Sequence, residues 1–361
     1  HVITLNKTRN RMPRWLSEGI SVYEERQRNP AWGQTMTPVF REMTLGDDLT
    51  PVSELSAAFL SPKSSTHLSF AYYESSLVVE FLIERYGFPA LLKILEDLAA
   101  GVAINPAIER RTDSLDLIET EFADFARSRA NALGNHPDGP VDWSSPTLTD
   151  TRPETLQQYL QDHPLNYNAL MLQAKSLLEQ ERWTDARPVL EQLVRLYPTA
   201  TGSQAPARQL ISVLNKLNDV EAERELLTTY CQQDAAAPFS YRRLAELEAS
   251  RKNWEAVRLN AERELAVNPL TPAPHLHLAL AAEQTGHLPQ ALKALQSALA
   301  LNAVDAALLH YRSARLLQQQ GDLAAARRSV LKSLEVAPRY RDAQKLLLEL
   351  VENTPAPTAA P

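Results

Sequence analysis

The stretch "LLHYRSARLLQQQGDLAAARRSVLKSLEVAP", residues 308–338, decides the fold of the second half of the chain. It holds an apolar run of helical period, a polar turn around Gly321, a second helical run and a closing proline, Pro338. The same pattern returns upstream every 34 to 36 residues, which predicts a stack of similar helical hairpins. The period is marked by the small residues Ala186, Ala222, Ala256, Ala291 and Ala325 and by the prolines Pro198, Pro269 and Pro338.

Each part of this unit has a physical role. We expect the small residues to let two helices approach and the prolines to end the second helix of each unit. Gly286 and Gly321 fall at the turns, where glycine adopts a left-handed backbone at little cost. The unit at residues 204–237 is degenerate, with "KLNDVEAE" in place of the usual turn. About five units are expected between residues 154 and 352.

This unit resembles the tetratricopeptide repeat, a helix–turn–helix of similar length, and the resemblance covers more than half of the chain. It implies a helical solenoid whose first helices line a concave surface that binds proteins or peptides. Polar and cationic side chains on those helices are candidates for holding a peptide carboxylate. They are Lys175, Arg242, Arg243, His277 and Arg312.

Composition narrows the class of protein. Only 10 glycines in 361 residues, with 44% hydrophobic and 22% charged residues, favour a helical globular chain, so we predict an all-α fold. The net charge of −7 argues against binding to nucleic acid, because no basic surplus can neutralise phosphates. Cys231 is the single cysteine, which excludes an internal disulfide and a cysteine-based zinc site. No stretch reaches 18 consecutive apolar residues, so no transmembrane segment is expected.

The chain divides by composition into four segments. Residues 1–133 form a helical block, residues 134–153 read as a linker rich in Gly, Pro, Asp and Ser, residues 154–352 hold the repeats, and residues 353–361 are expected to be disordered. Inside the first block, a long connection between two helical runs is punctuated by prolines. Such a connection in a compact domain is typical of a functional surface. Its prolines are Pro30, Pro38, Pro51 and Pro62.

A carboxylate interrupts the helical run "RWLSEGISVY", residues 14–23. Glu18 is costly there if it is buried, unless it pairs with a cation or binds a metal. Arg14 lies one turn before it and is the ordinary ion-pair partner for a solvated helix. His1, seventeen residues upstream, is the other candidate partner.

The segment "HVITLNKTRNRMPRWLSEGISVYEE" resembles the bacterial peptidase MA-like domains, zinc metallopeptidases of the gluzincin class that occur fused to tetratricopeptide repeats. In that class two histidines of an H-E-x-x-H helix and a glutamate from the next helix hold zinc. The resemblance implies that His1 is the last histidine of the motif and that Glu18 is the third ligand. It also implies that Tyr73, or less favourably Tyr72, in "YYESSLVVEFLIERYG" donates to the oxyanion.

The resemblance places the first histidine and the glutamate of the motif before His1. Two ligands rarely hold zinc, so we expect this chain to bind Zn2+ weakly and to lack hydrolase activity. The alternative is a non-catalytic scaffold that binds proteins through its repeats. An N-terminal histidine can also chelate copper, but the enzymes that use it so are β-sandwiches. Relatives with this pairing imply a cell-envelope or periplasmic location.

Overall fold

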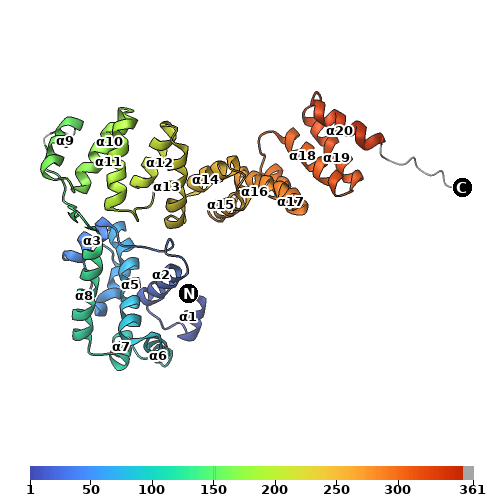
Figure 1. The fold of residues 1–361 in the computed structure, drawn as a ribbon. Coiled ribbons are helices and arrows are strands. Elements are labelled where there is room, and N and C mark those ends of the chain that lie inside the picture. The colour runs from blue at the N-terminus through green and yellow to red at the C-terminus, as the bar shows by residue number, and fades with distance from the viewer. Residues whose placement is uncertain (149, 151, 353–361) are drawn as a thin grey trace. The chain divides into compact units, whose positions relative to one another are not determined.

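The computed structural model describes residues 1–148, 150 and 152–352. Over these residues the fold is all-α, as predicted, with one two-stranded sheet (Figure 1). The tail at 353–361, expected to be disordered, lies outside the described residues. Among the helices of the described residues, none is long and apolar enough to cross a membrane.

The chain forms two compact units, His1–Asn218 and Asp219–Pro361. The division falls inside the helical array, after α12 and before α13, and not at the segment 134–153 that composition marks as a linker. The first unit therefore holds the N-terminal helices together with the first helices of the array.

The long helix α5 is the centre of the first unit, because apolar side chains surround most of its length. It packs against α2, α4, α6 and α8. The closest approach is to α2 at Gly19, where an added Cβ would lie 2.5 Å from the carbonyl oxygen of Ser75. Only glycine permits that spacing. The helices of this block are α1 (Val2–Lys7), α2 (Arg14–Arg28), α3 (Pro38–Leu45), the 3₁₀ turn η1 (Val52–Glu54), α4 (Leu55–Leu60), α5 (Ser65–Tyr86), α6 (Phe88–Ala99), α7 (Ile104–Arg111) and α8 (Leu115–Ala132).

The described part of the segment 134–153 packs against the first repeat. Strands β1 (Asn135–His136) and β2 (Gly139–Pro140) pair antiparallel just after α8. The ring of Trp143 then lies 5.0 Å from that of Tyr167 and 5.9 Å from that of Tyr197. Burial of three aromatic rings fixes this part of the connection, so it is not a free linker.

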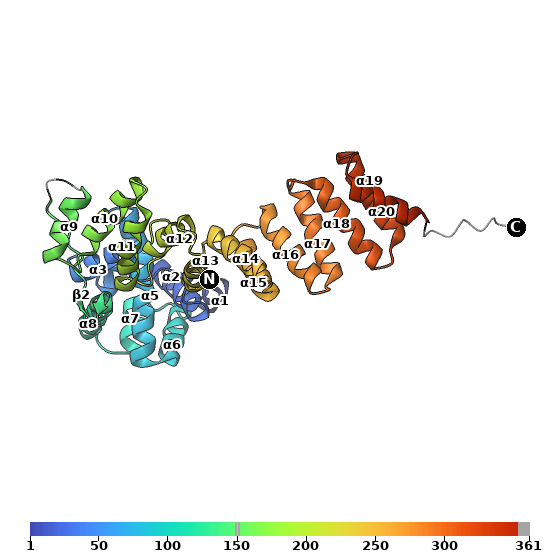
Figure 2. The same cartoon turned by 45° about the horizontal axis from the view of Figure 1, so that its top comes forward.

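The repeats form helical hairpins, and Figure 2 shows those of the second unit following one another in sequence order. Gly286 and Gly321 adopt positive φ at their turns, as expected, and non-glycine residues take the same conformation in the other hairpins. Those residues are Glu181, Asn218 and Lys252. The helices are α9 (Pro153–Asp162), α10 (Tyr167–Glu179), α11 (Trp183–Leu196), α12 (Pro206–Lys216), α13 (Val220–Gln233), α14 (Pro238–Ser250), α15 (Trp254–Val267), α16 (Pro272–Gln284), α17 (Leu288–Ala300), α18 (Ala306–Gln319), α19 (Leu323–Val336) and α20 (Arg341–Glu352).

The alanines of the period lie in the second helix of each unit, but only two of the five are fully buried. Ala186 and Ala291 are buried at the fourth position of α11 and α17, but in α13, α15 and α19 the alanine of the period is the third residue and is only half-buried. The reason is the helix start. Capped by Asp219, Asn253 and Asp322, whose side-chain oxygens accept from the backbone N–H three residues later, α13, α15 and α19 start one residue later relative to the alanine. All five helices bury their fourth residue. In α13, α15 and α19 these residues are Glu223, Val257 and Ala326.

Candidate functional site

His1 and Glu18 meet at the start of the first unit. His1 immediately precedes α1, Glu18 lies in the second turn of α2, and the Nε2 atom of His1 is 3.5 Å from Oε2 of Glu18. The other ring nitrogen, Nδ1, is 2.9 Å from the hydroxyl oxygen of Ser17. The side chain of His1 is 50% exposed and that of Glu18 is 21% exposed, so the pair is open to solvent on one side.

Arg14 and Tyr72 complete this cluster. Arg14 donates from Nε to the second carboxylate oxygen of Glu18 at 3.5 Å, and from Nη2 to the hydroxyl oxygen of Tyr72 at 2.8 Å. Both pairings expected for Glu18, with His1 and with Arg14, are therefore present together. The carboxylate is held between a histidine and an arginine, and a phenol lies on the far side of the arginine.

Tyr73 lies in the aromatic core. Its ring stacks on that of Phe40 at 5.3 Å and its side chain is buried, which raises the pKa of its hydroxyl. Successive residues on a helix point about 100° apart, so Tyr72 and Tyr73 face different surroundings. The hydroxyl joined to the His1–Glu18 cluster is that of Tyr72, the neighbour that the sequence-based interpretation ranked second.

The spacing of His1 and Glu18 can be compared with that of two zinc ligands. Zinc bonds of about 2.0–2.2 Å place a histidine nitrogen and a carboxylate oxygen on one tetrahedral ion roughly 3.3 Å apart, close to the spacing of His1 and Glu18. A hydrogen-bonding partner on the other ring nitrogen, here Ser17, is the usual support of a ligating histidine. Among the described residues, no group of three or more His, Cys, Asp and Glu could hold a metal ion. His1 and Glu18 thus fit two ligand positions and do not complete a site by themselves.

The arginines expected to face a peptide groove are paired inside the array. Arg242 donates to Glu264, Arg243 to Glu223 and Arg312 to Glu283, all within 3.2 Å. Glu264 and Glu223 are almost completely buried, so two of these arginines neutralise interior carboxylates. The ring of His277 is half-buried, and that burial lowers its pKa. Arg242 joins the two helices of one repeat, whereas Arg243 and Arg312 join neighbouring repeats, and all three partners lie 20 or more residues away in sequence.

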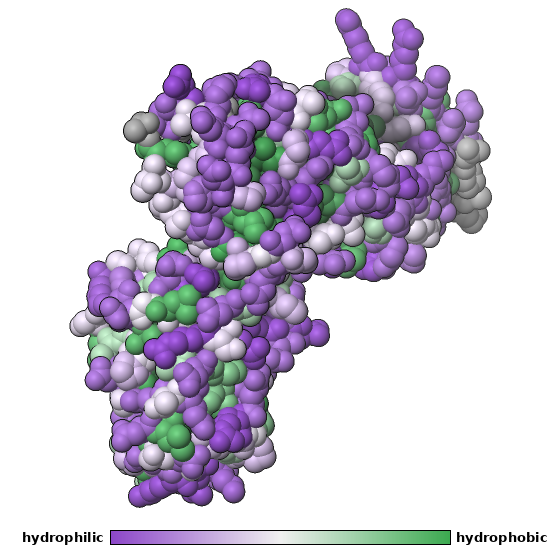
Figure 3. All heavy atoms as spheres, turned by 60° about the vertical axis from the view of Figure 1, so that its left-hand side comes forward, coloured by the Kyte–Doolittle hydropathy of each residue, from purple (hydrophilic) through white to green (hydrophobic). Residues whose placement is uncertain are grey.

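Lys175 is the candidate that faces solvent. Its side chain is 72% exposed, and its ammonium lies 3.9 Å from Glu179. It lines a cavity of about 690 Å³ between α10, α12 and the segment before the first repeat. Met171 and Leu172 provide apolar surface in this cavity, and Gln209 adds an amide. Figure 3 shows apolar residues in small, separate patches among hydrophilic ones on the face it presents.

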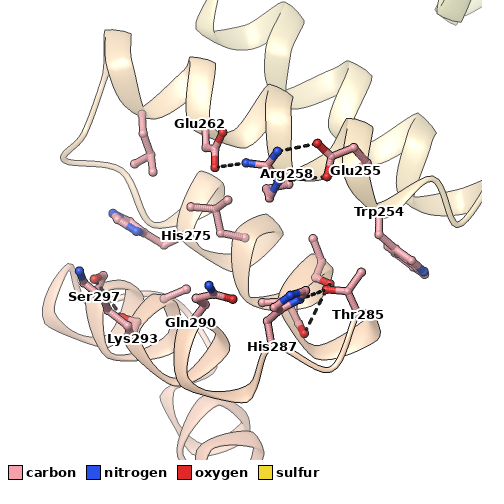
Figure 4. Close-up of a pocket in the computed structure, with 15 residues that line it drawn as sticks. Trp254, Glu255, Arg258, Glu262, His275, Thr285, His287, Gln290, Lys293 and Ser297 are labelled. Atoms are coloured by element: carbon pink, nitrogen blue, oxygen red, sulfur yellow. Dashed lines mark hydrogen bonds and ion pairs between the residues drawn. The ribbon is translucent and has the colours of Figure 1, made fainter.

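A second cavity, of about 680 Å³, lies between α15, α16 and α17 (Figure 4). On one wall Arg258 is held between Glu255 and Glu262 at 2.5 and 2.6 Å. On another, the ring of His287 is 2.9 Å from the hydroxyl of Thr285. Sequence reasoning did not single out this cavity, because its charged side chains read as the ordinary solvated face of a helix.

Comparison with protein families finds a match in each part of the chain. Residues 1–117 match the model of the Peptidase MA superfamily, and residues 154–201 and 276–338 match a tetratricopeptide repeat model. No curated protein matches the chain by sequence.

Among solved structures, YrrB, described as a tetratricopeptide-repeat protein with an unusual peptide-binding site, is 10% identical, with 54% of this chain and 97% of YrrB covered and a TM-score of 0.45. MamA from Desulfovibrio magneticus is 16% identical, with 48% and 96% covered and a TM-score of 0.39. A thermophilic tetratricopeptide-repeat protein of Thermus thermophilus is 21% identical, with 52% and 99% covered and a TM-score of 0.31. By sequence, residues 1–117 thus match the Peptidase MA superfamily, and the helices within residues 154–201 and 276–338 match tetratricopeptide repeats.

Proposed function

We propose that the N-terminal helices of this chain are part of a zinc-peptidase site in which His1 and Glu18 are two of the metal ligands. The observation that carries the proposal is the 3.5 Å separation of a histidine nitrogen and a carboxylate oxygen from two different helical segments. The match of residues 1–117 to the Peptidase MA superfamily supports it. Bound zinc would polarise a peptide carbonyl and lower the pKa of a coordinated water.

The surrounding side chains have positioning roles in this proposal. The contact of Ser17 with Nδ1 of His1 orients the ring so that Nε2 faces Glu18. Arg14 fixes the other carboxylate oxygen. Because Arg14 donates to the oxygen of Tyr72, the phenolic proton of Tyr72 can be donated outward, to negative charge that develops on a substrate oxygen.

We further propose that these 361 residues alone bind zinc weakly and hydrolyse no peptides. The described residues supply two ligands, whereas catalytic zinc sites use three. Hydrolysis of any member of a peptide panel by the purified chain, abolished by a chelator, would contradict this inactivity.

Zinc binding tests the ligand assignment. We expect Glu18→Gln to weaken zinc binding by at least about tenfold, because the amide removes the anionic ligand. Glu24→Gln, on the exposed face of the same helix, is the matched control and should leave the affinity within about twofold. Isothermal titration of zinc into each chain gives the comparison, and equal affinities for wild type and Glu18→Gln would refute the assignment.

We propose that the repeats are the protein-binding part of the chain and that a peptide docks in the cavity beside Lys175. The exposed ammonium and the neighbouring apolar side chains suit an extended segment that carries an acidic group and aliphatic residues. Arg242, Arg243 and Arg312 are less suited to this role, because glutamates already engage them.

A labelled peptide of alternating aspartate and leucine tests the cavity. We expect Lys175→Met to weaken its binding about fivefold, which corresponds to roughly 1 kcal/mol for an exposed ion pair. Lys345→Met, an exposed lysine of α20, should change nothing. Fluorescence anisotropy measures both, and an equal loss in the two variants would show that only net charge matters.

A further inference from the structure

A small pocket lies between the proline-punctuated connection and one face of α5. It encloses about 290 Å³, and α5 contributes His67, Phe70, Ala71 and Glu74 to it. These four positions follow the three- and four-residue spacing of one helix face. The opposite walls come from residues 47–63, where Leu49 and two prolines of the connection provide apolar surface. The pocket shares no lining residue with the His1–Glu18 cluster.

Glu74 is the unusual member of this pocket. Its side chain is 1% exposed, and its Oε1 atom accepts a hydrogen bond from the backbone N–H of Thr50 at 2.5 Å. Its Oε2 atom is buried and has no hydrogen-bond partner among the described residues. Burial raises the pKa of this carboxyl to about 8, and the backbone and side chain of Thr50 oppose the shift only in part. A buried carboxyl oxygen without a partner is costly, so a ligand that pairs with it would relieve that cost.

The charged side chains around the pocket favour one sign of charge on the ligand. The Oδ1 atom of Asp48 lies 2.7 Å from Nζ of Lys63 and 3.3 Å from Nε2 of His67. Asp47 lines the same pocket and is exposed. These four and Glu74 are the titratable groups that line the pocket. An anion would face the carboxyl groups of Asp47 and Glu74 with Lys63 already engaged, so a cation is favoured.

The lining also selects the kind of cation. A metal ion is not favoured, since the described residues bring no three suitable ligands together here. The apolar walls suit a short aliphatic stem, and a volume of about 290 Å³ lies at the small end of ligand pockets. An ammonium supplies the N–H donors that an unpaired carboxylate oxygen accepts.

We propose that this pocket binds a primary alkylammonium group, with Oε2 of Glu74 as its acceptor and Asp47 at the entrance. The group can belong to a free amine or to a lysine side chain of another protein, and the two share the same chemistry. Binding adds a cation beside Glu74, so the carboxyl must lose its proton as the ammonium enters.

Calorimetry of the full chain with two probes tests the proposal. The probes are n-pentylamine and the peptide acetyl-Gly-Lys-Gly-amide, and n-pentanol is the uncharged comparison. We expect saturable binding of at least one cationic probe, with close to one proton released per bound ammonium at pH 7, as repeat titrations in buffers of different ionisation enthalpy would show. Preference for pentylamine identifies a free amine as the ligand, and preference for the peptide identifies a lysine side chain.

Variants locate the binding. Glu74→Gln keeps the shape of the side chain but cannot carry the charge, so binding should fall at least about tenfold and the proton release should vanish. Asp124→Asn on the exposed face of α8 is the matched control and should behave as wild type. The proposal fails if no probe binds below about 10 mM, if pentanol binds as well as pentylamine, or if wild type releases no proton. The measurement of proton release by the wild-type chain needs no variant, so it tests the proposal even if Glu74→Gln folds poorly.

Discussion

Replacement of Glu74 by glutamine is expected to abolish a large loss of stability that the first unit suffers between pH 4.5 and pH 8. The unfolded carboxyl has a pKa of about 4.3, whereas burial raises the folded pKa to about 8. Between these values the unfolded state is ionised and the folded state holds a proton, so the free energy of unfolding falls as pH rises. The fall is about 1.4 kcal/mol per pH unit and reaches roughly 4–5 kcal/mol by pH 8.

The pH dependence, and not the absolute stability, is the quantity to compare. Urea unfolding at several pH values, followed by hydrogen exchange of peptides from α5, reports on this unit alone. Asp124→Asn should retain the wild-type slope, because that side chain is 77% exposed. Parallel curves for wild type and Glu74→Gln would mean that Glu74 is ionised in the folded protein, contrary to the burial that the structure gives it.

The second large effect is expected at Arg242. Its Nε and Nη2 atoms both donate to Oε1 of Glu264, a side chain with no exposed surface. Arg242→Met would leave a buried carboxylate without its cation, which destabilises the second unit by about 3–5 kcal/mol. Replacing Glu264 by leucine in the same chain should recover most of that loss. Exchange of a buried ion pair for a matched apolar pair changes the free energy of unfolding little.

Arg258→Met is the control for this experiment. Arg258 pairs with Glu255 and Glu262 on an exposed surface, so its loss should change stability by about 1 kcal/mol or less. Hydrogen exchange of peptides from α14 and α15 measures all three variants. If Arg242→Met leaves exchange unchanged and instead weakens peptide binding, the groove role predicted for this arginine from the sequence would be restored.

The period of the repeats predicts the hairpins, but the residue that each second helix buries depends on where that helix starts. Alanines spaced 34 to 36 residues apart mark the units correctly. Asp219 and Asn253 nevertheless start their helices one residue later relative to the alanine, and this brings Glu223 and Val257 inward. The alanines do not reveal this shift, because their spacing of 34 to 36 residues does not say where each helix starts.

The resemblance to the peptidase MA-like domains implies that His1 and Glu18 meet, and the structure places a nitrogen of one 3.5 Å from an oxygen of the other. The resemblance does not resolve Tyr72 from Tyr73, because the rotation of α5 is set by its packing against α2 and not by its own sequence. The burial of Glu74 could not be predicted from the sequence for a related reason. Its burial depends on the irregular connection that covers it, and that segment has no period from which its position could be derived.

The contact at Gly19 has a consequence for the chemistry proposed at its neighbour. Glu18 and Tyr72 reach each other through Arg14 from two helices that touch, backbone to backbone, one residue beyond the carboxylate. The absence of a side chain at Gly19 therefore sets the distance between the carboxylate of Glu18 and the hydroxyl of Tyr72. A change of a single methyl group there would widen the span between them without altering any reactive atom.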